Sequence, residues 1–166
     1  MAENKTLDII KGAILLEHRG KALYESVARQ SRVEAVKDLF EMLVKEEASH
    51  IDILNKQFGR VANGEPFDVQ DLEQSHPEVK DNVMSDAVTR AISGAGYEAA
   101  VIAAGLDFEK KAVEYYSQQA NAAGSDEEKQ LYRWLADWEM GHMQMFAQLD
   151  KKLREQVWYD NSFWPF

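Results

Sequence analysis

Two short stretches of the sequence, Lys45-Glu-Glu-Ala-Ser-His50 and Glu139-Met-Gly-His142, decide the fold and the site that we expect. In each of them a glutamate, Glu47 or Glu139, stands three residues before a histidine. This spacing puts a carboxylate and an imidazole on the same face of an α-helix, about one turn apart. Both stretches lie in long segments whose apolar residues recur every three or four positions, the period of a helix with one buried face. The ionisable residues therefore occupy positions where such a face normally carries apolar side chains.

An offset of 92 residues superimposes the two stretches and the segments that precede them. At this offset Glu17 falls on Glu109, and Tyr24 falls on Tyr116. In each half of the chain, 30 residues separate the first glutamate from the glutamate of the stretch. The match indicates a duplicated helical hairpin, and it predicts an approximate two-fold axis inside the protein.

Four segments have the composition and the apolar spacing of long helices. They are residues 5–30, 34–58, 97–121 and 126–157. Capping-box patterns, Ser31-Arg-Val-Glu34 and Ser125-Asp-Glu-Glu128, stand before the second and the fourth segment, which indicates tight turns there. We therefore expect an all-α four-helix bundle made of two αα-hairpins, residues 5–58 and 97–157.

The segment between the hairpins, residues 59–96, and the end of the chain, residues 158–166, differ in composition from the helices. The first holds turn-forming pairs such as Asn63-Gly64 and His76-Pro77. We expect it to form one long crossover from one end of the bundle to the other, with room for a short helix over Glu78–Ser93. The second is rich in aromatic residues, and we expect a short C-terminal aromatic tail that packs on the bundle or on a second copy of the chain.

Six ionisable residues lie in the middle of the predicted buried faces. They are Glu17, Glu47, His50, Glu109, Glu139 and His142. Burial of four uncompensated carboxylates is costly, and two divalent cations balance their four negative charges. Two helices with a Glu-x-x-His pair and two with a single glutamate are the ligand pattern of di-metal bundles. Carboxylate and imidazole ligands suit iron or manganese, with zinc possible.

Other candidates receive simpler interpretations. Glu73-Gln-Ser-His76 has the same spacing, but it precedes a proline and has no counterpart at the 92-residue offset, so we interpret it as incidental. His18 is turned about 100° from Glu17 and is expected at the surface or beside the ligands. Tyr24 and Tyr116 are expected in the core, and their alternative role is a hydrogen bond to a ligand carboxylate. The side chains expected to pack, and not to carry electrons, are Trp134, Trp138, Met140, Met143 and Met145.

The composition of the 166 residues narrows the function further. Asp and Glu number 29 against 19 Lys and Arg, and a surface with a net charge of −10 makes nucleic acid and membranes poor partners. The absence of Cys excludes disulfides, thiolate metal sites and iron–sulfur clusters within these residues. Because the sequence starts without a signal-peptide pattern and has no apolar stretch long enough to span a bilayer, we expect a soluble cytoplasmic protein.

With these residues in place, the sequence resembles the ferritin-like superfamily and, within it, the rubrerythrin-like di-iron proteins. The likeness covers both hairpins. It rests on Glu17 with Tyr24, on Glu109 with Tyr116, and on the Lys45–His50 and Glu139–His142 stretches.

The resemblance implies a single ferritin-like domain over residues 1–166 that holds two iron ions. It implies that all six ionisable residues are metal ligands, with Glu47 and Glu139 as bridges and Glu17 and Glu109 as terminal ligands. It also implies an enzyme that reduces hydrogen peroxide or dioxygen at this centre.

Two departures from rubrerythrins modify that expectation. No Cys-ligated rubredoxin domain is present in these residues, so the expected reductant is a separate electron-donor protein or a small molecule. The extra glutamate that rubrerythrins carry one turn after the third-helix ligand is replaced by Ala112, which makes the site symmetric and closer to a bacterioferritin ferroxidase site. A ferroxidase that stores iron, a substrate oxygenase and a metal-stapled bundle without turnover therefore stay open as alternatives. A homodimer is the expected assembly.

Overall fold

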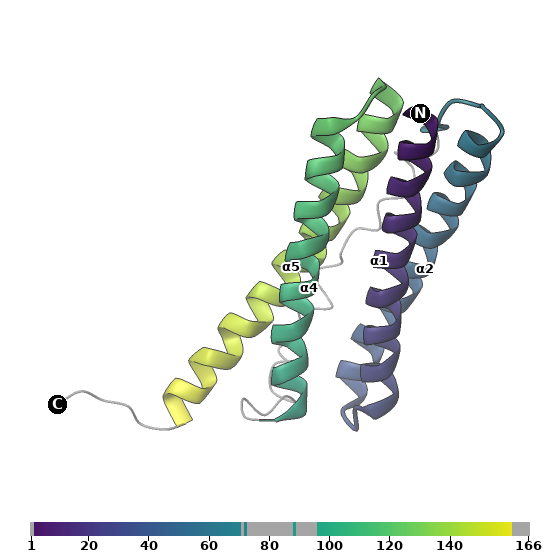
Figure 1. The fold of residues 1–166 in the computed structure, drawn as a ribbon. Helices are drawn as coiled ribbons and strands as arrows, with labels where there is room; N and C mark the ends of the chain where they lie inside the picture. Colours follow the sequence, from purple (N-terminus) through teal and green to yellow (C-terminus); the bar gives the residue numbers. More distant parts are fainter. Residues whose placement is uncertain (1, 71, 73–87, 89–95, 161–166) are drawn as a thin grey trace.

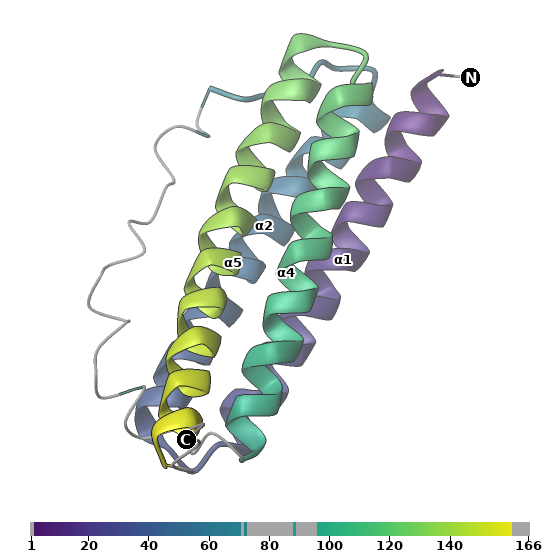
Figure 2. The same cartoon turned by 90° about the vertical axis from the view of Figure 1, so that its left-hand side faces the viewer.

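The computed structural model describes residues 2–70, 72, 88 and 96–160. Within them the chain forms four long helices, α1 (Ala2–Gln30), α2 (Glu34–Ala62), α4 (Tyr97–Ala122) and α5 (Asp126–Asp160). Figure 1 shows α1 beside α2 and α4 beside α5, and Figure 2 shows the same two pairs from the side. None of the helices in the described ranges has the length and apolar character needed to cross a membrane. The predicted all-α four-helix bundle of two hairpins is confirmed.

The two hairpins are joined across the length of the bundle. The helices of each pair run in opposite directions, and α2 ends near the start of α1 (Figure 1). Helix α4 begins at the other end of the bundle, near the turn between α1 and α2. The connection from Ala62 to Tyr97 therefore links opposite ends, as expected of the crossover. The predicted helix over Glu78–Ser93 lies outside the described residues except for Val88, whose side chain is buried.

Two apolar clusters fill the bundle, one toward each end. The first surrounds Tyr24, Phe40 and Phe146 near the turn between α1 and α2. The second surrounds Tyr116 and Tyr132 near the turn between α4 and α5. Each cluster takes side chains from all four helices, so each of them ties the two hairpins together. The space between the clusters lies halfway along the helices, and the candidate site occupies it.

Helix α2 extends four residues beyond its predicted end at Phe58, because the loop that follows is fastened to its last turns. The side-chain amide of Gln57 donates to the backbone oxygen of Asp68 at 2.7 Å. The backbone N–H of Asp68 donates back to Gln57 Oε1 at 2.9 Å. After Ala62 the chain turns at Gly64, which adopts the left-handed conformation with φ 73°, in agreement with the predicted Asn63-Gly64 turn.

The two capping-box patterns have different outcomes. Ser125 caps α5, because its Oγ accepts a hydrogen bond from the backbone N–H of Glu128 at 3.1 Å, while the Glu128 carboxylate accepts from the N–H of Gly124 at 2.8 Å. The predicted capping box at Ser31 is wrong, because Val33 is the N-cap residue of α2 and has no side-chain cap. The Ser31 Oγ instead accepts from the N–H of Val33 at 3.2 Å and so stabilises the turn before the helix.

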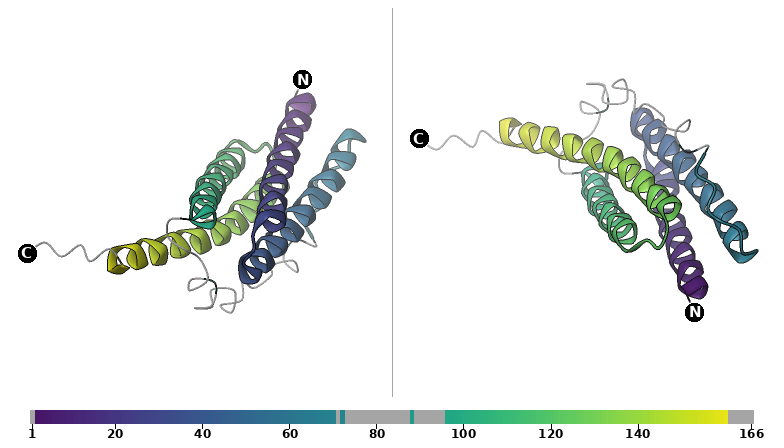
Figure 3. Two further views of the ribbon diagram at one scale, coloured as in Figure 1. Left: turned by 90° about the horizontal axis from the view of Figure 1, so that it is seen from below. Right: turned by 90° about the horizontal axis from the view of Figure 1, so that it is seen from above.

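Helix α5 is also longer than predicted. It continues to Asp160, so residues 158–160 are helical and not part of the tail, and Trp158 is 60% exposed. Figures 1 and 3 show its last turns leaving the other three helices. That the aromatic tail packs on the bundle or on a second copy of the chain stays a prediction, because residues 161–166 lie outside the described ranges.

Candidate metal centre

The six predicted ligand residues all lie in the middle of the bundle, between the two apolar clusters. Helices α1 and α4 contribute one glutamate each, and α2 and α5 contribute a glutamate and a histidine each. They are Glu17, Glu47, His50, Glu109, Glu139 and His142, at 0–1% exposure. The three-to-four-residue spacing that buries the neighbouring apolar side chains also buries these ionisable ones. The structure thus brings together every residue for which the sequence predicts a ligand role.

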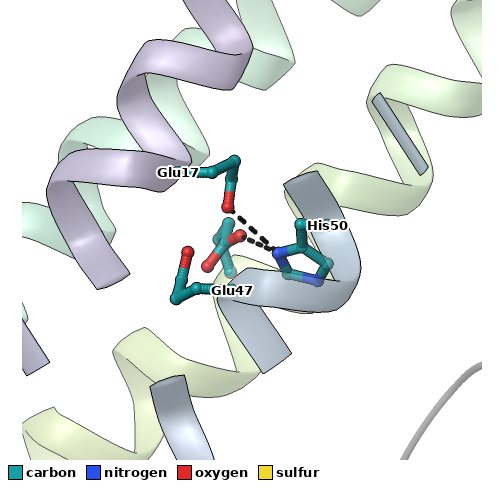
Figure 4. A group of neighbouring side chains, drawn as sticks. Glu17, Glu47 and His50 are labelled. Atoms are coloured by element: carbon teal, nitrogen blue, oxygen red, sulfur yellow. Dashed lines mark hydrogen bonds and ion pairs between the residues drawn. The ribbon is translucent and has the colours of Figure 1, made fainter. Parts of the chain in front are cut away.

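One group of four residues gathers around His50. Ligand atoms of Glu17, Glu47, His50 and Glu139 all lie within 4.8 Å of one another. The Nδ1 atom of His50 is 3.1 Å from Glu17 Oε2 and 3.1 Å from Glu139 Oε1. Figure 4 shows Glu17 and Glu47 turned toward the same side of the His50 ring. Three carboxylates and one imidazole nitrogen therefore converge on one small volume.

A second group of four gathers around His142. Ligand atoms of Glu47, Glu109, Glu139 and His142 also lie within 4.8 Å of one another. The Nδ1 atom of His142 is 3.1 Å from Glu139 Oε2 and 3.5 Å from Glu109 Oε1. Glu47 and Glu139 belong to both groups, so the two groups adjoin. The arrangement suits two cation positions that share two carboxylates. Each position has in addition one carboxylate and one imidazole that the other lacks.

Two buried tyrosines hold the unshared glutamates from the opposite hairpin. The hydroxyl of Tyr24 on α1 donates a hydrogen bond to Glu109 Oε1 on α4. The hydroxyl of Tyr116 on α4 donates to Glu17 Oε1 on α1. Burial raises the pKa of both phenols well above the ordinary value, and the carboxylates beside them raise it further, so both remain donors. The predicted alternative role of the two tyrosines, a hydrogen bond to a carboxylate of the site, is therefore present in both halves of the repeat.

Glu46 also reaches the centre, although the sequence did not single it out. Its Oε2 lies 2.5 Å from Nε2 of His142, on the side of the ring away from the other carboxylates. No pattern in the sequence marks Glu46 as a partner of His142, because its counterpart at the 92-residue offset is an aromatic residue, Trp138. In the structure the Trp138 ring packs against His50, with ring centroids 4.9 Å apart and planes at 87°.

The remaining candidates take no part in the two groups of ligands. His18 is exposed, as one of its predicted alternatives has it. Trp134 and Trp138 are buried, and their rings are 4.9 Å apart, which agrees with the predicted packing role. Glu73 and His76 lie outside the described residues, so their assignment as incidental stays a prediction.

Burial and crowding alter the acid–base properties of the carboxylates. Burial raises the pKa of Glu47 well above its ordinary value, and the charges of Glu139 and Glu17 raise it further. Burial and Glu139 together raise the pKa of Glu109 to about 8, against an opposing effect of His142. Burial also acts to raise the pKa of Glu139, but this carboxylate lies between both imidazoles, which outweigh burial and hold its pKa below the ordinary value.

The two imidazoles respond in the opposite sense to burial and still bind protons more strongly than usual. Burial lowers the pKa of His50, but Glu139 and Glu17 outweigh it and raise this pKa to about 9. For His142 burial is likewise outweighed, chiefly by Glu109 and Glu139. In the absence of cations the cluster therefore holds protons that bound metal would displace.

The chemistry of the residues fits a pair of divalent cations. Within the described residues, Glu47 Oε1 and Glu109 Oε2 are buried and accept no hydrogen bond, which is costly for a carboxylate oxygen unless a cation binds it. Four carboxylates carry the charge that two divalent cations neutralise. Oxygen ligands with imidazole nitrogen are the donors that iron and manganese take, and that zinc accepts.

Comparisons with known proteins are consistent with this geometry. Residues 8–150 match the family model of rubrerythrin. No curated protein and no solved structure matches the chain. Because the match spans most of the 166 residues and includes all six predicted ligand residues of the four-helix bundle, the chain belongs to the rubrerythrin family, which has the ferritin-like fold.

Proposed function

We propose that the protein is an oxidoreductase that reduces hydrogen peroxide at two iron ions held by the six buried residues. The observation that carries the proposal is the pair of adjoining ligand groups with Glu47 and Glu139 in common. Such groups are suited to hold two cations side by side. Two adjacent ferrous ions, when bound, supply one electron each, and with two protons these convert one hydrogen peroxide into two water molecules.

Each residue has a role in holding the pair. Glu47 and Glu139 would serve both cation positions. Glu17 with His50, and Glu109 with His142, would complete one position each, since Nδ1 of each imidazole faces the carboxylates. The hydrogen bonds from Tyr116 and Tyr24 keep the two unshared carboxylates oriented. The apolar clusters on either side exclude bulk water, which strengthens the attraction between carboxylates and cations.

Burial of the centre favours a small, uncharged oxidant. All six ligand side chains are 0–1% exposed in the described part of the chain. Hydrogen peroxide and dioxygen are small enough to reach such a site through side-chain fluctuations, whereas a bulky organic substrate requires an open pocket beside the ligands. Two pockets in the described part of the chain, lined by residues of α4 and α5 and by Leu72, include none of the six predicted ligands. We therefore favour peroxide or dioxygen over oxygenation of an organic substrate.

Electrons are proposed to come from a separate donor protein, because the 166 residues contain no Cys to hold a second iron centre. We propose the cytoplasm as the location of the reaction. We propose a homodimer as the assembly.

One observation favours a second candidate, a ferroxidase that stores iron. Ala112 is 2% exposed and lies one turn after Glu109. Rubrerythrins carry an extra glutamate at this position. Without that carboxylate the ligand set is the same in both halves, which is the ferroxidase pattern of bacterioferritins.

The test is anaerobic loading of the metal-free chain with ferrous iron, followed by rapid mixing with hydrogen peroxide or with dioxygen. We expect two iron ions per chain after desalting, oxidation of both by one peroxide, and faster oxidation by peroxide than by dioxygen. Faster oxidation by dioxygen, with uptake of many iron ions per chain, would support storage instead. Failure to retain iron, with retention of zinc, would support a structural metal site without turnover.

A further inference from the structure

The strongest difference between the two halves of the centre lies at one pair of positions. Glu46 and Trp138 correspond at the 92-residue offset, and each directly precedes one of the shared glutamates. Each also lies against the histidine of the other hairpin. Glu46 Oε2 is 2.5 Å from His142 Nε2, whereas the Trp138 ring meets the His50 ring edge to face at a centroid distance of 4.9 Å.

These contacts affect the ring nitrogens that face away from the carboxylate cluster. Both histidines direct Nδ1 at the cluster, at 3.1 Å from oxygens of Glu139. At His142 the Glu46 carboxylate accepts a hydrogen bond from Nε2–H, and this fixes the tautomer that leaves the Nδ1 lone pair for a cation. At His50 the Nε2 atom makes no hydrogen bond to any residue that the structure describes. Apart from the contacts of Nδ1, the His50 ring packs edge to face against Trp138 and Trp134.

The same contact adds negative charge to one side of the centre. The Glu46 side chain is 12% exposed, so its carboxylate is largely withdrawn from solvent where it meets His142. A carboxylate hydrogen-bonded to a ligating imidazole makes the other ring nitrogen a stronger donor. An indole ring at the equivalent place supplies packing but no net charge.

We propose that Glu46 is a positioning residue that makes the two cation positions unequal. Through His142 it makes the position formed by Glu47, Glu109, Glu139 and His142 the tighter one, which fills first with a divalent cation. The position completed by His50 is weaker and fills second. This inference rests on the proposed two-cation centre and adds an order of loading to it.

The test is a titration of the metal-free full-length chain with Co²⁺. Binding is monitored by visible absorption and by the paramagnetically shifted ring N–H resonances of the two histidines. We expect two binding steps, with H142A removing the tighter and H50A the weaker. E46A should weaken the tighter step by about 10- to 100-fold and change the resonance of one ring N–H only, that of His142. E46Q should fall between E46A and the unmodified chain, because its amide oxygen still accepts the hydrogen bond but carries no charge.

Glu41→Gln is the matched control, because it removes the same charge from the same helix. The Glu41 side chain is 49% exposed. It should leave both steps unchanged. Two steps of wild-type affinity in both E46A and E46Q, or a change at the His50 resonance in place of the His142 resonance, would overturn the inference and leave the two-cation centre standing. Failure of the unmodified chain to bind two cations would instead overturn the proposed function, and the inference with it.

Discussion

The two halves of the candidate metal centre agree in their predicted ligands and differ in the residues that surround them. Glu17 and Glu109 are equivalent, as are His50 and His142, and each unshared glutamate accepts a hydrogen bond from a tyrosine of the other hairpin. The surroundings diverge. Phe40 packs on Tyr24 with ring centroids 5.6 Å apart. At the equivalent place in the other half, Tyr132 packs on Tyr116.

The divergence shows which features the centre requires and which it tolerates. Groups that offer an oxygen or nitrogen to a cation position, and the hydroxyls that orient them, occur in both halves. Apolar and aromatic neighbours need only fill space, so they differ between halves as long as the volume is filled. The Glu46–Trp138 pair is the exception, because there the change replaces a charge with an indole next to a ligand histidine.

The largest effect is expected from removing a shared carboxylate. Glu47→Ala or Glu139→Ala should reduce the bound metal from two ions per chain to fewer than one, because each carboxylate belongs to both groups. Glu17→Ala should leave one ion, because Glu17 belongs to the His50 group alone. Elemental analysis of the desalted protein measures these numbers. Glu73→Ala is the control and should retain two ions, and equal losses in the shared and unshared variants would contradict the division into two groups.

The next largest effect concerns the pH dependence of the metal-free protein. Burial and its neighbours raise the pKa of Glu109 to about 8, and carboxylates raise that of His50 to about 9. Between pH 6 and pH 9 the folded state therefore holds more protons than the unfolded state, so the stability of the metal-free protein falls as the pH rises. Glu109 alone should contribute a loss of about 2 kcal/mol between pH 6 and pH 8.

Urea unfolding of the metal-free chain at several pH values measures this loss. Glu109→Gln should reduce the slope, because its neutral amide stands in for the protonated carboxyl. Metal-loaded protein should lose no stability over the same range, since the cations neutralise the carboxylates. A metal-free protein that becomes more stable from pH 6 to pH 8 would contradict the prediction.

A smaller and symmetric effect is expected from the tyrosines. Tyr24→Phe removes the hydrogen bond to Glu109, and Tyr116→Phe removes the one to Glu17. Each should lower the affinity of one cation position by about 10- to 100-fold, because the carboxylate loses its orienting donor. Competition titration with Zn²⁺ and a chelator measures both affinities. Loss at the same position in both variants would show that the two hydrogen bonds are not equivalent.

The smallest effect compares the two hairpin turns. Ser125→Ala should destabilise the protein by about 1 kcal/mol, because it removes the side-chain cap of α5. Ser31→Ala should cost less, because Val33, and not Ser31, is the N-cap residue of α2. Thermal unfolding of the metal-loaded variants measures the difference. A larger loss for Ser31→Ala would contradict the assignment of the caps.

The sequence predicted the bundle and the ligand cluster because both depend on periodicity. Helical spacing decides which face of each helix is buried. The 92-residue offset shows the same ionisable residues at equivalent positions of both hairpins, so all six could be placed on inward faces. The ligand role of each of the six stays a prediction until metal binding is measured.

The sequence could not predict features that depend on contacts between distant residues. Gly59 suggests an end to α2, since glycine is a poor helix former, but the hydrogen bonds between Gln57 and Asp68 hold the helix beyond it. Ser31 and Ser125 stand in the same pattern, and only the path of the backbone decides which of them caps a helix. Glu46 was missed because its partner, His142, lies 96 residues away on another hairpin.

The internal repeat has a consequence for how the centre can evolve. A hairpin that paired with an identical copy of itself would carry the same residue at both equivalent positions, so a carboxylate against one histidine would require a carboxylate against the other. Once both hairpins belong to one polypeptide, each position accepts mutations independently. Glu46 and Trp138 are such a divergent pair, which two identical hairpins could not carry.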